Sequence, residues 1–219
     1  MAISGLPDLA PPANLREQVV SALSAAIISG ELAPGALVSV PTLAARFGVS
    51  ATPVREAMLD LEQRGFVEPV RNKGFRVTEV VEADLHEIVQ IRQLVEVPAT
   101  ASLRLPADRI AEFREKADAI VAGEQRSDLT AYLAADVDFH LSLLALTGNR
   151  RLVALVADLR SQTRMTGLAH MLGTTELAAS AAEHHELLDL LVAGKTRDVR
   201  TLMSRHVGHV LGWWAGRPE

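Results

Sequence analysis

The sequence predicts a mainly α-helical protein built in two parts, on three observations. Apolar residues recur at helical spacing through most of the 219 residues. Near residue 70, two short runs rich in β-branched and aromatic residues, FVEPV and FRVTEV, flank a turn sequence. Beyond residue 80 the long segments all keep the helical period. We therefore expect helices and a hairpin in the N-terminal third, and helices alone behind it.

The N-terminal third divides into three helices and the hairpin. Apolar spacing predicts the first helix over Leu15 to Ile28, and GELAPGALVSV after it is typical of a turn that leads into a short extended piece. The other two helices are expected at Pro41 to Phe47, before Gly48, and from a cap at Ser50 or Thr52 to about Gln63. Three helices followed by a hairpin are the element order of a winged helix-turn-helix.

Residues 83–219 are expected to form an antiparallel bundle of about six helices. Glycine, proline or polar residues interrupt the apolar pattern at Pro106, Gly123 to Asp128, Gly148, Gly173 and Gly194. The expected organisation is a flexible N-terminal arm over 1–11, the winged unit over 12–80, a hinge at Val80 to Glu82, and the helical unit over 83–219.

Composition excludes several classes of protein. The chain has no cysteine, so it has neither disulfides nor thiolate metal sites, and it suits a reducing compartment. No run approaches the roughly 18 apolar residues of a membrane span. The first 15 residues lack the basic start and apolar run of a secretory signal. We expect a cytoplasmic protein with no membrane partner.

Charge alone gives little support to nucleic-acid binding. The formal net charge is -5, and residues 1–80 carry 7 Lys and Arg against 8 Asp and Glu. Contact with phosphates would depend on a few clustered side chains. The prediction of a DNA-binding unit therefore rests on the helix-turn-helix pattern.

The second helix of a helix-turn-helix enters the major groove of DNA. Here that helix begins with Ser50, Thr52 and Arg55, where base edges are within reach. Arg55 suits guanine, and the two hydroxyl groups suit phosphates or thymine edges. A small helical domain whose charges are only solvated would have the same element order, so order alone leaves both interpretations open.

Further DNA contacts are expected from the hairpin tip and from the preceding helix. Arg71 and Lys73 supply positive charge at the tip, and Gly74 would let the backbone approach a minor groove or a phosphate. Arg46 is either an additional contact or an exposed charge without a role.

Three histidines and one aspartate fall on the inward sides of predicted helices. Asp136 and His140 are four residues apart and share one helix face, while His184 and His206 lie in register with the apolar stripes of two later helices. A single inward histidine is usually a satisfied core residue. Burying four such groups together is costly unless something pairs them. A divalent cation does that, with zinc as the first choice and nickel or manganese as alternatives.

The segment VSATPVREAMLDLEQRGFVEPVRNKGFRV closely resembles the N-terminal signature of GntR-type bacterial regulators, over roughly residues 12–80. The resemblance implies a winged helix-turn-helix that binds double-stranded operator DNA. Ala51 stands where the family often has an arginine, and Pro41 where it often has another basic residue. These departures predict fewer charge contacts and a different or less tightly bound operator.

Residues 84–219 are similar to the FCD domain, the helical effector domain of the FadR branch of that family. In the metal-binding members the matching positions are ligands, which implies that Asp136, His140, His184 and His206 hold the metal. The acyl-CoA-binding members do not use this set, so its presence argues against a fatty-acyl effector.

Two further residues are candidates for contacting an effector. Arg92, with Glu96 four residues later, matches a pair on the family's first effector helix. It forms either an ion pair on a solvated face or a fork that binds a carboxylate in the cavity. Asn149 either contacts the effector or caps the next helix.

The function that these residues and resemblances predict is a homodimeric transcription regulator, a repressor. It would bind two operator half-sites and release them when a small organic acid binds at the metal. A regulator for which the ion itself is the signal is one alternative. A metalloenzyme is the other, and it is disfavoured because no spare acid or base with an evident catalytic role accompanies the ligands.

Overall fold

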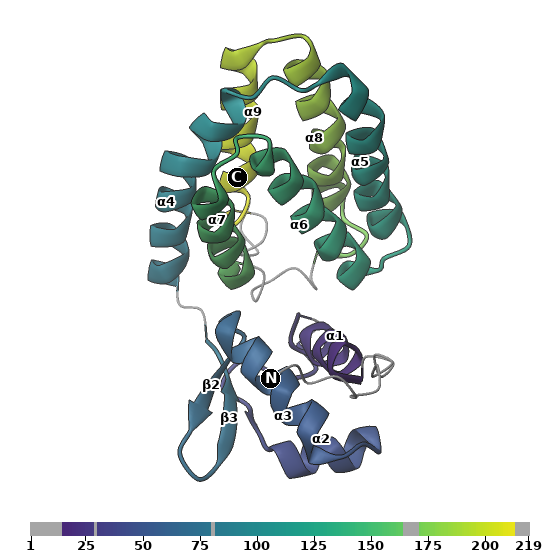
Figure 1. The fold of residues 1–219 in the computed structure, drawn as a ribbon, viewed down its shortest axis with the longest axis vertical. Coiled ribbons are helices and arrows are strands. Elements are labelled where there is room, and N and C mark those ends of the chain that lie inside the picture. Colours follow the sequence, from purple (N-terminus) through teal and green to yellow (C-terminus); the bar gives the residue numbers. More distant parts are fainter. Residues whose placement is uncertain (1–14, 29, 80–81, 164–170, 213–219) are drawn as a thin grey trace, which may run out of the picture.

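The computed structural model describes residues 15–28, 30–79, 82–163 and 171–212. The chain folds into an N-terminal part of helices and a small sheet, and a bundle of longer helices (Figure 1). The expected fold, a winged helix-turn-helix followed by an all-helical bundle, is confirmed. No helix of these ranges is long and apolar enough to cross a membrane. The expected arm at 1–11, and Val80 and Val81 of the expected hinge, lie outside the described residues.

The helices of the N-terminal part are α1 (Leu15–Ile28), α2 (Val40–Phe47) and α3 (Ala51–Gln63). Each presents apolar residues three and four positions apart to one shared core. The core residues that α3 contributes are Val54, Ala57, Met58 and Leu61. They pack with Val19, Val20, Leu23 and Ile27 of α1.

The turn between α2 and α3 has the local chemistry of a helix end and a helix start. Gly48 ends α2 with a left-handed φ of 65°, and its N–H donates to the carbonyls of Ala44 and Ala45. Ser50 is the N-cap of α3 in extended backbone, and its side chain makes no capping hydrogen bond. The hydroxyl of Ser50 therefore stays at the surface instead of closing the helix end.

Three strands form one antiparallel sheet in the order β1-β3-β2. They are β1 (Leu37–Val38), β2 (Val67–Val70) and β3 (Gly74–Val77). The predicted hairpin is β2 and β3, and the extended piece predicted after the first helix is β1, which pairs with β3. The hairpin is thus the wing, anchored on one side by β1.

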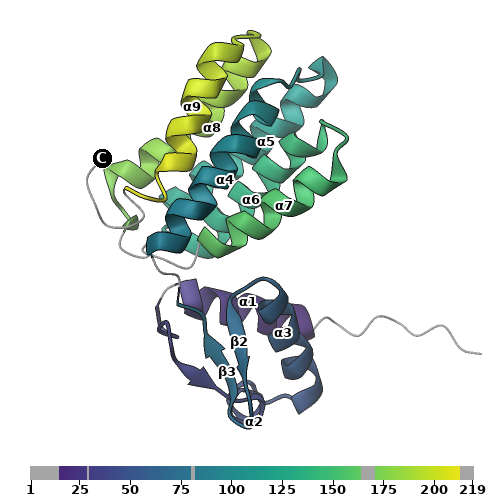
Figure 2. The same cartoon turned by 90° about the vertical axis from the view of Figure 1, so that its left-hand side faces the viewer.

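Six α-helices form the C-terminal bundle within the described ranges, in the number that the sequence predicts. They are α4 (Glu82–Ala101), α5 (Ile110–Gln125, after a 3₁₀ turn at Ala107–Arg109), α6 (Leu129–Ala145), α7 (Arg150–Thr163), α8 (Thr175–Val192) and α9 (Thr196–Gly208). They run side by side in the view of Figure 2. Fully buried side chains such as Phe113, Ile120, Tyr132 and Phe139 fill the space between them.

Gly74 is required by the sheet itself. Its φ is 113°, and a Cβ there would lie 2.3 Å from the carbonyl oxygen of Val38. Gly74 stays a predicted DNA contact, and its backbone also lies close to Val38 of β1. The glycine therefore serves the construction of the wing.

We predict that Gly74→Ala lowers the free energy of unfolding by about 1–3 kcal/mol, because the methyl group meets backbone and the φ is unfavourable for alanine. Chemical denaturation followed by circular dichroism measures it. Lys73→Ala is the matched control, since Lys73 is exposed beside it and should leave stability unchanged. Unchanged stability of the glycine variant would contradict this assignment.

Candidate functional site

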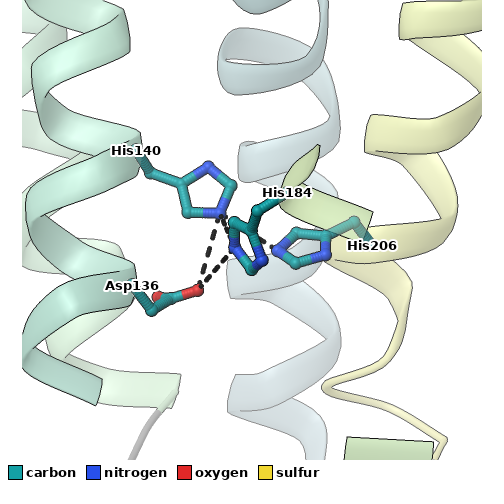
Figure 3. A group of neighbouring side chains, drawn as sticks. All are labelled: Asp136, His140, His184 and His206. Carbon is teal, nitrogen blue, oxygen red and sulfur yellow. Dashed lines mark hydrogen bonds and ion pairs between the residues drawn. The ribbon is translucent and has the colours of Figure 1, made fainter. Parts of the chain in front are cut away.

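Asp136, His140, His184 and His206 converge in the middle of the bundle (Figure 3). The first two lie on α6, the third on α8 and the fourth on α9. The Nε2 atom of His140 is 3.0 Å from Nε2 of His184 and 3.1 Å from Nε2 of His206. Oδ1 of Asp136 is 3.3 Å from Nε2 of His184 and 3.5 Å from Nε2 of His140. None of the four is more than 7% exposed.

The hydrogen bonds behind the rings fix which nitrogen carries the proton. Nδ1 of His184 lies 3.0 Å from the carbonyl oxygen of Ala181, which can only accept. Nδ1 of His206 lies 2.8 Å from Oε2 of Glu183, a carboxylate that also accepts. In the neutral rings both Nε2 atoms are therefore unprotonated, and both face the Nε2 of His140.

One proton on His140 cannot satisfy this arrangement. If Nε2 of His140 carries its proton, it can donate to only one of its three neighbours, which are Nε2 of His184, Nε2 of His206 and Oδ1 of Asp136. The other two acceptors are then left buried without that hydrogen bond. A cation among the four atoms removes that conflict. Metal–nitrogen bonds of about 2.1 Å place neighbouring ligand atoms roughly 3.0–3.4 Å apart, which agrees with the observed separations. The side chains fit a divalent metal ion.

The protonation states favour ligation at neutral pH. Burial lowers the pKa of His206 to about 4, although the Glu183 carboxylate opposes the shift. Burial also lowers the pKa of His140 well below its usual value, and the nearby charge of Arg160 adds to that effect. For Asp136, burial raises the pKa, but Arg160 and the histidines outweigh it and hold the pKa well below the usual range. Neutral imidazoles and an ionised carboxylate are the forms that bind metals.

A buried ion-pair network lies beside the cluster. Nη1 of Arg160, on α7, donates to Oδ2 of Asp136 at 2.8 Å, and its Nε and Nη2 donate to Oε1 of Glu96 at 3.0 and 2.7 Å. Nε of Arg92 donates to Oε2 of Glu96 at 2.8 Å. The predicted pair of Arg92 and Glu96 exists, but on the buried side of α4 instead of a solvated face. The two positive charges of the arginines therefore offset the two negative charges of Glu96 and Asp136.

Glu183 supports His206 from outside the cluster. Its carboxylate also accepts from Nε of Arg205 at 2.8 Å and from Nε2 of His209 at 3.0 Å. Glu183, His206 and His209 form a second group with ligand-like spacing. Arg205 already supplies positive charge to that carboxylate, so we interpret Glu183 as the group that orients His206.

Sequence reasoning missed the roles of Arg160, Glu183 and His209. A signal for Arg160 was present, because it continues the buried stripe of Val156 and Thr163 on α7. His209 follows His206 by three positions, on the same side of the last helix. Asn149 lies elsewhere: it is exposed, and its Oδ1 accepts from the N–H of Leu152, so it caps α7.

The residues predicted to contact DNA lie on the N-terminal part, and all of them except the half-buried Gly74 are exposed. Ser50, Thr52 and Arg55 lie along the first turns of α3. Arg46, on α2, lies 3.6 Å from Glu31 across an exposed ion pair. Arg71 and Lys73 lie at the β2–β3 turn, where Asn72 adopts a left-handed φ of 60°. The tip of the wing and α2 both lie at the end of the molecule away from the bundle (Figure 1).

Comparison with known proteins agrees with this architecture. Residues 87–209 match the FCD domain, and residues 15–77 match the bacterial regulatory proteins of the gntR family. The probable D-xylose utilization operon transcriptional repressor of Paenarthrobacter nicotinovorans is 32% identical over 189 residues, which are 84% of this chain and 82% of that protein. An uncharacterized HTH-type regulator of Streptomyces ambofaciens is 28% identical over 192 residues, which cover 88% of this chain and 81% of the relative.

Solved structures give the same result. Escherichia coli McbR/YncC superposes with a TM-score of 0.71 at 26% identity, covering 89% of this chain and 94% of that one. A transcriptional regulator GntR from Rhodococcus sp. RHA1 superposes with a TM-score of 0.69 at 26% identity, covering 93% of this chain and 99% of that one.

A winged helix-turn-helix joined to a helical bundle of this kind defines a DNA-binding transcriptional regulator, and the relatives are regulators, not enzymes. The chain belongs to the GntR family and carries an FCD domain.

We predict that Glu183→Gln weakens Zn²⁺ binding by about 10–100-fold, because the amide no longer holds the His206 ring with a full negative charge. Chelator competition measures the dissociation constant. Glu186→Gln is the control, since Glu186 lies on the same helix, is exposed, and is 3.6 Å from Arg205. Equal affinity in both variants would refute the orienting role.

Proposed function

We propose that the protein is a homodimeric repressor whose operator binding responds to a small organic acid held at a divalent metal in the bundle. The observation that carries this proposal is the buried cluster of Asp136, His140, His184 and His206. The Nε2 atoms of its three histidines converge with too few protons to pair them all. Zinc is the first choice for the ion, with nickel or manganese as alternatives. One of the relatives is named as a transcriptional repressor, which supports repression over activation.

Charge balance supports an acid as the effector. Asp136 and Glu96 are already balanced by Arg160 and Arg92, and Glu183 is paired with Arg205. A divalent ion therefore adds positive charge that no described group of the cluster offsets. A carboxylate that binds the ion in its open coordination positions would supply that charge.

Space at the cluster suggests how binding would be coupled to shape. The void bordered by His140, His184, His206, Leu202 and Met203 has no volume open to a water molecule. An organic acid would have to displace the apolar side chains of α9 to reach the ion. Binding would then favour one arrangement of the helices over another, as a ligand-controlled repressor requires.

On the DNA side, we predict that Arg55→Ala weakens binding to a selected operator by about 1–3 kcal/mol and relaxes preference at one base pair, because a bidentate contact with guanine is lost. Fluorescence anisotropy over a series of operator variants measures both effects. Arg126→Ala is the control, since Arg126 is exposed on the bundle. Equal losses for both variants would mean that Arg55 contributes only general charge.

On the sensing side, we predict that hydroxy acids and dicarboxylic acids raise the melting temperature of the Zn²⁺-loaded protein but not of the chelator-treated protein. His184→Ala should lose the response to metal and acids and still bind operator. His185→Ala is the matched control, because its side chain pairs with Asp118 outside the cluster.

Two results would contradict parts of this proposal. If Zn²⁺ alone changes operator affinity and no acid adds to that change, the ion itself is the signal. If His184→Ala binds Zn²⁺ as the wild type does, the four residues are not the metal site.

A further inference from the structure

The last turn of α7 lies between the cluster and the DNA-reading helix. Arg160 faces the bundle interior and is buried, while the next residue, Ser161, faces the N-terminal part. The C-terminal end of α7 points towards that part of the molecule (Figure 1). Two adjacent side chains of one helix therefore contact two different functional regions.

On the outer side, Ser161 contacts the end of the recognition helix. Its Oγ lies 3.0 Å from the backbone carbonyl oxygen of Arg64 and 2.6 Å from that of Asp158, so its one proton is shared between an acceptor at the end of α3 and one within α7. Arg64 is the C-cap of α3, and Gly65 follows it with a left-handed φ of 75°. A Cβ at Gly65 would lie 3.6 Å from Cγ of Gln162, so the Gln162 side chain of α7 lies against the end of α3.

The packing around this contact is open. A cavity of about 480 Å³ lies on one side, lined in part by Gly65, Ile88 and Leu159. Another of about 580 Å³ is lined in part by Phe66, Leu133 and Ser161. Because the surroundings are loosely filled, the position of α3 relative to the bundle depends strongly on the contacts that do exist.

On the inner side, Arg160 is bound to a predicted metal ligand. Its guanidinium joins Oδ2 of Asp136 to Oε1 of Glu96, while Oδ1 of Asp136 faces the histidines. One oxygen of the carboxylate thus serves the cluster and the other serves α7. Any ion bound by Oδ1 fixes the carboxylate that holds Arg160, and with it the last turn of α7.

We propose that Arg160 and Ser161 couple the metal cluster to the recognition helix. Binding of an ion at Asp136 makes the last turn of α7 more rigid, and the contact of Ser161 with Arg64 makes the C-terminal end of α3 more rigid in turn. The coupling rests on the metal site proposed above. By thermodynamic linkage, DNA binding at α3 would change the affinity for the ion by the same factor by which the ion changes the affinity for DNA.

The test is amide hydrogen exchange of the full chain with and without Zn²⁺ alone. In the wild type, Zn²⁺ should slow exchange near His140, and it should also slow exchange at Arg64 to Phe66 by about threefold or more. Ser161→Ala should keep the first effect and its Zn²⁺ affinity, and lose the second. Ser142→Ala is the matched control, because its hydroxyl bonds Asp138 on an exposed face of α6.

A second variant tests the inner contact. Arg160→Lys keeps the charge but lacks the fork that joins Asp136 to Glu96, so the slowing at Arg64 to Phe66 should fall while Zn²⁺ still binds. Circular dichroism checks that this variant is folded.

The outcomes separate the two proposals. Slower exchange at His140 without any change at Arg64 to Phe66, or full retention of that change in Ser161→Ala, overturns the coupling and leaves the metal site standing. No Zn²⁺ binding at all overturns the metal site and the coupling with it.

Discussion

Three imidazole rings whose Nε2 atoms converge with too few protons between them are the constraint on which the bundle depends. The orientation of two rings is set from behind, by the carbonyl of Ala181 and the carboxylate of Glu183. The converging atoms come from α6, α8 and α9, so a cation held between them would link three helices. The arginines around Asp136 and Glu96 then keep the buried carboxylates ionised without a net charge.

Much of this architecture follows from local pattern. The sequence predicted α1 and α3 at their observed limits because each carries apolar residues at helical spacing and ends at a glycine or a polar cap. The same periodicity placed His140, His184 and His206 on inward faces, where they are found. A helix period tells which side of a helix is buried, and that was sufficient to group the four residues of the cluster.

The partners across helices were beyond the reach of that reasoning. Periodicity does not say which inward residues of different helices meet, so the contacts of Arg160 and of Glu183 needed the folded chain. An arginine in a helix is usually exposed, so the sequence alone offered no strong reason to place Arg160 in the core. Gly74 shows the opposite difficulty: glycine next to a turn has several explanations, and only the distance to Val38 identifies the close approach of β1.

The depth of the cluster has a kinetic consequence. Because the four proposed ligands are buried and the adjoining void admits no water molecule, a bound ion could leave only after the helices separate locally. The rate at which the helices open would then limit the exchange of a bound ion with free metal. Occupancy by an ion would therefore change only slowly after the metal concentration around the protein changes.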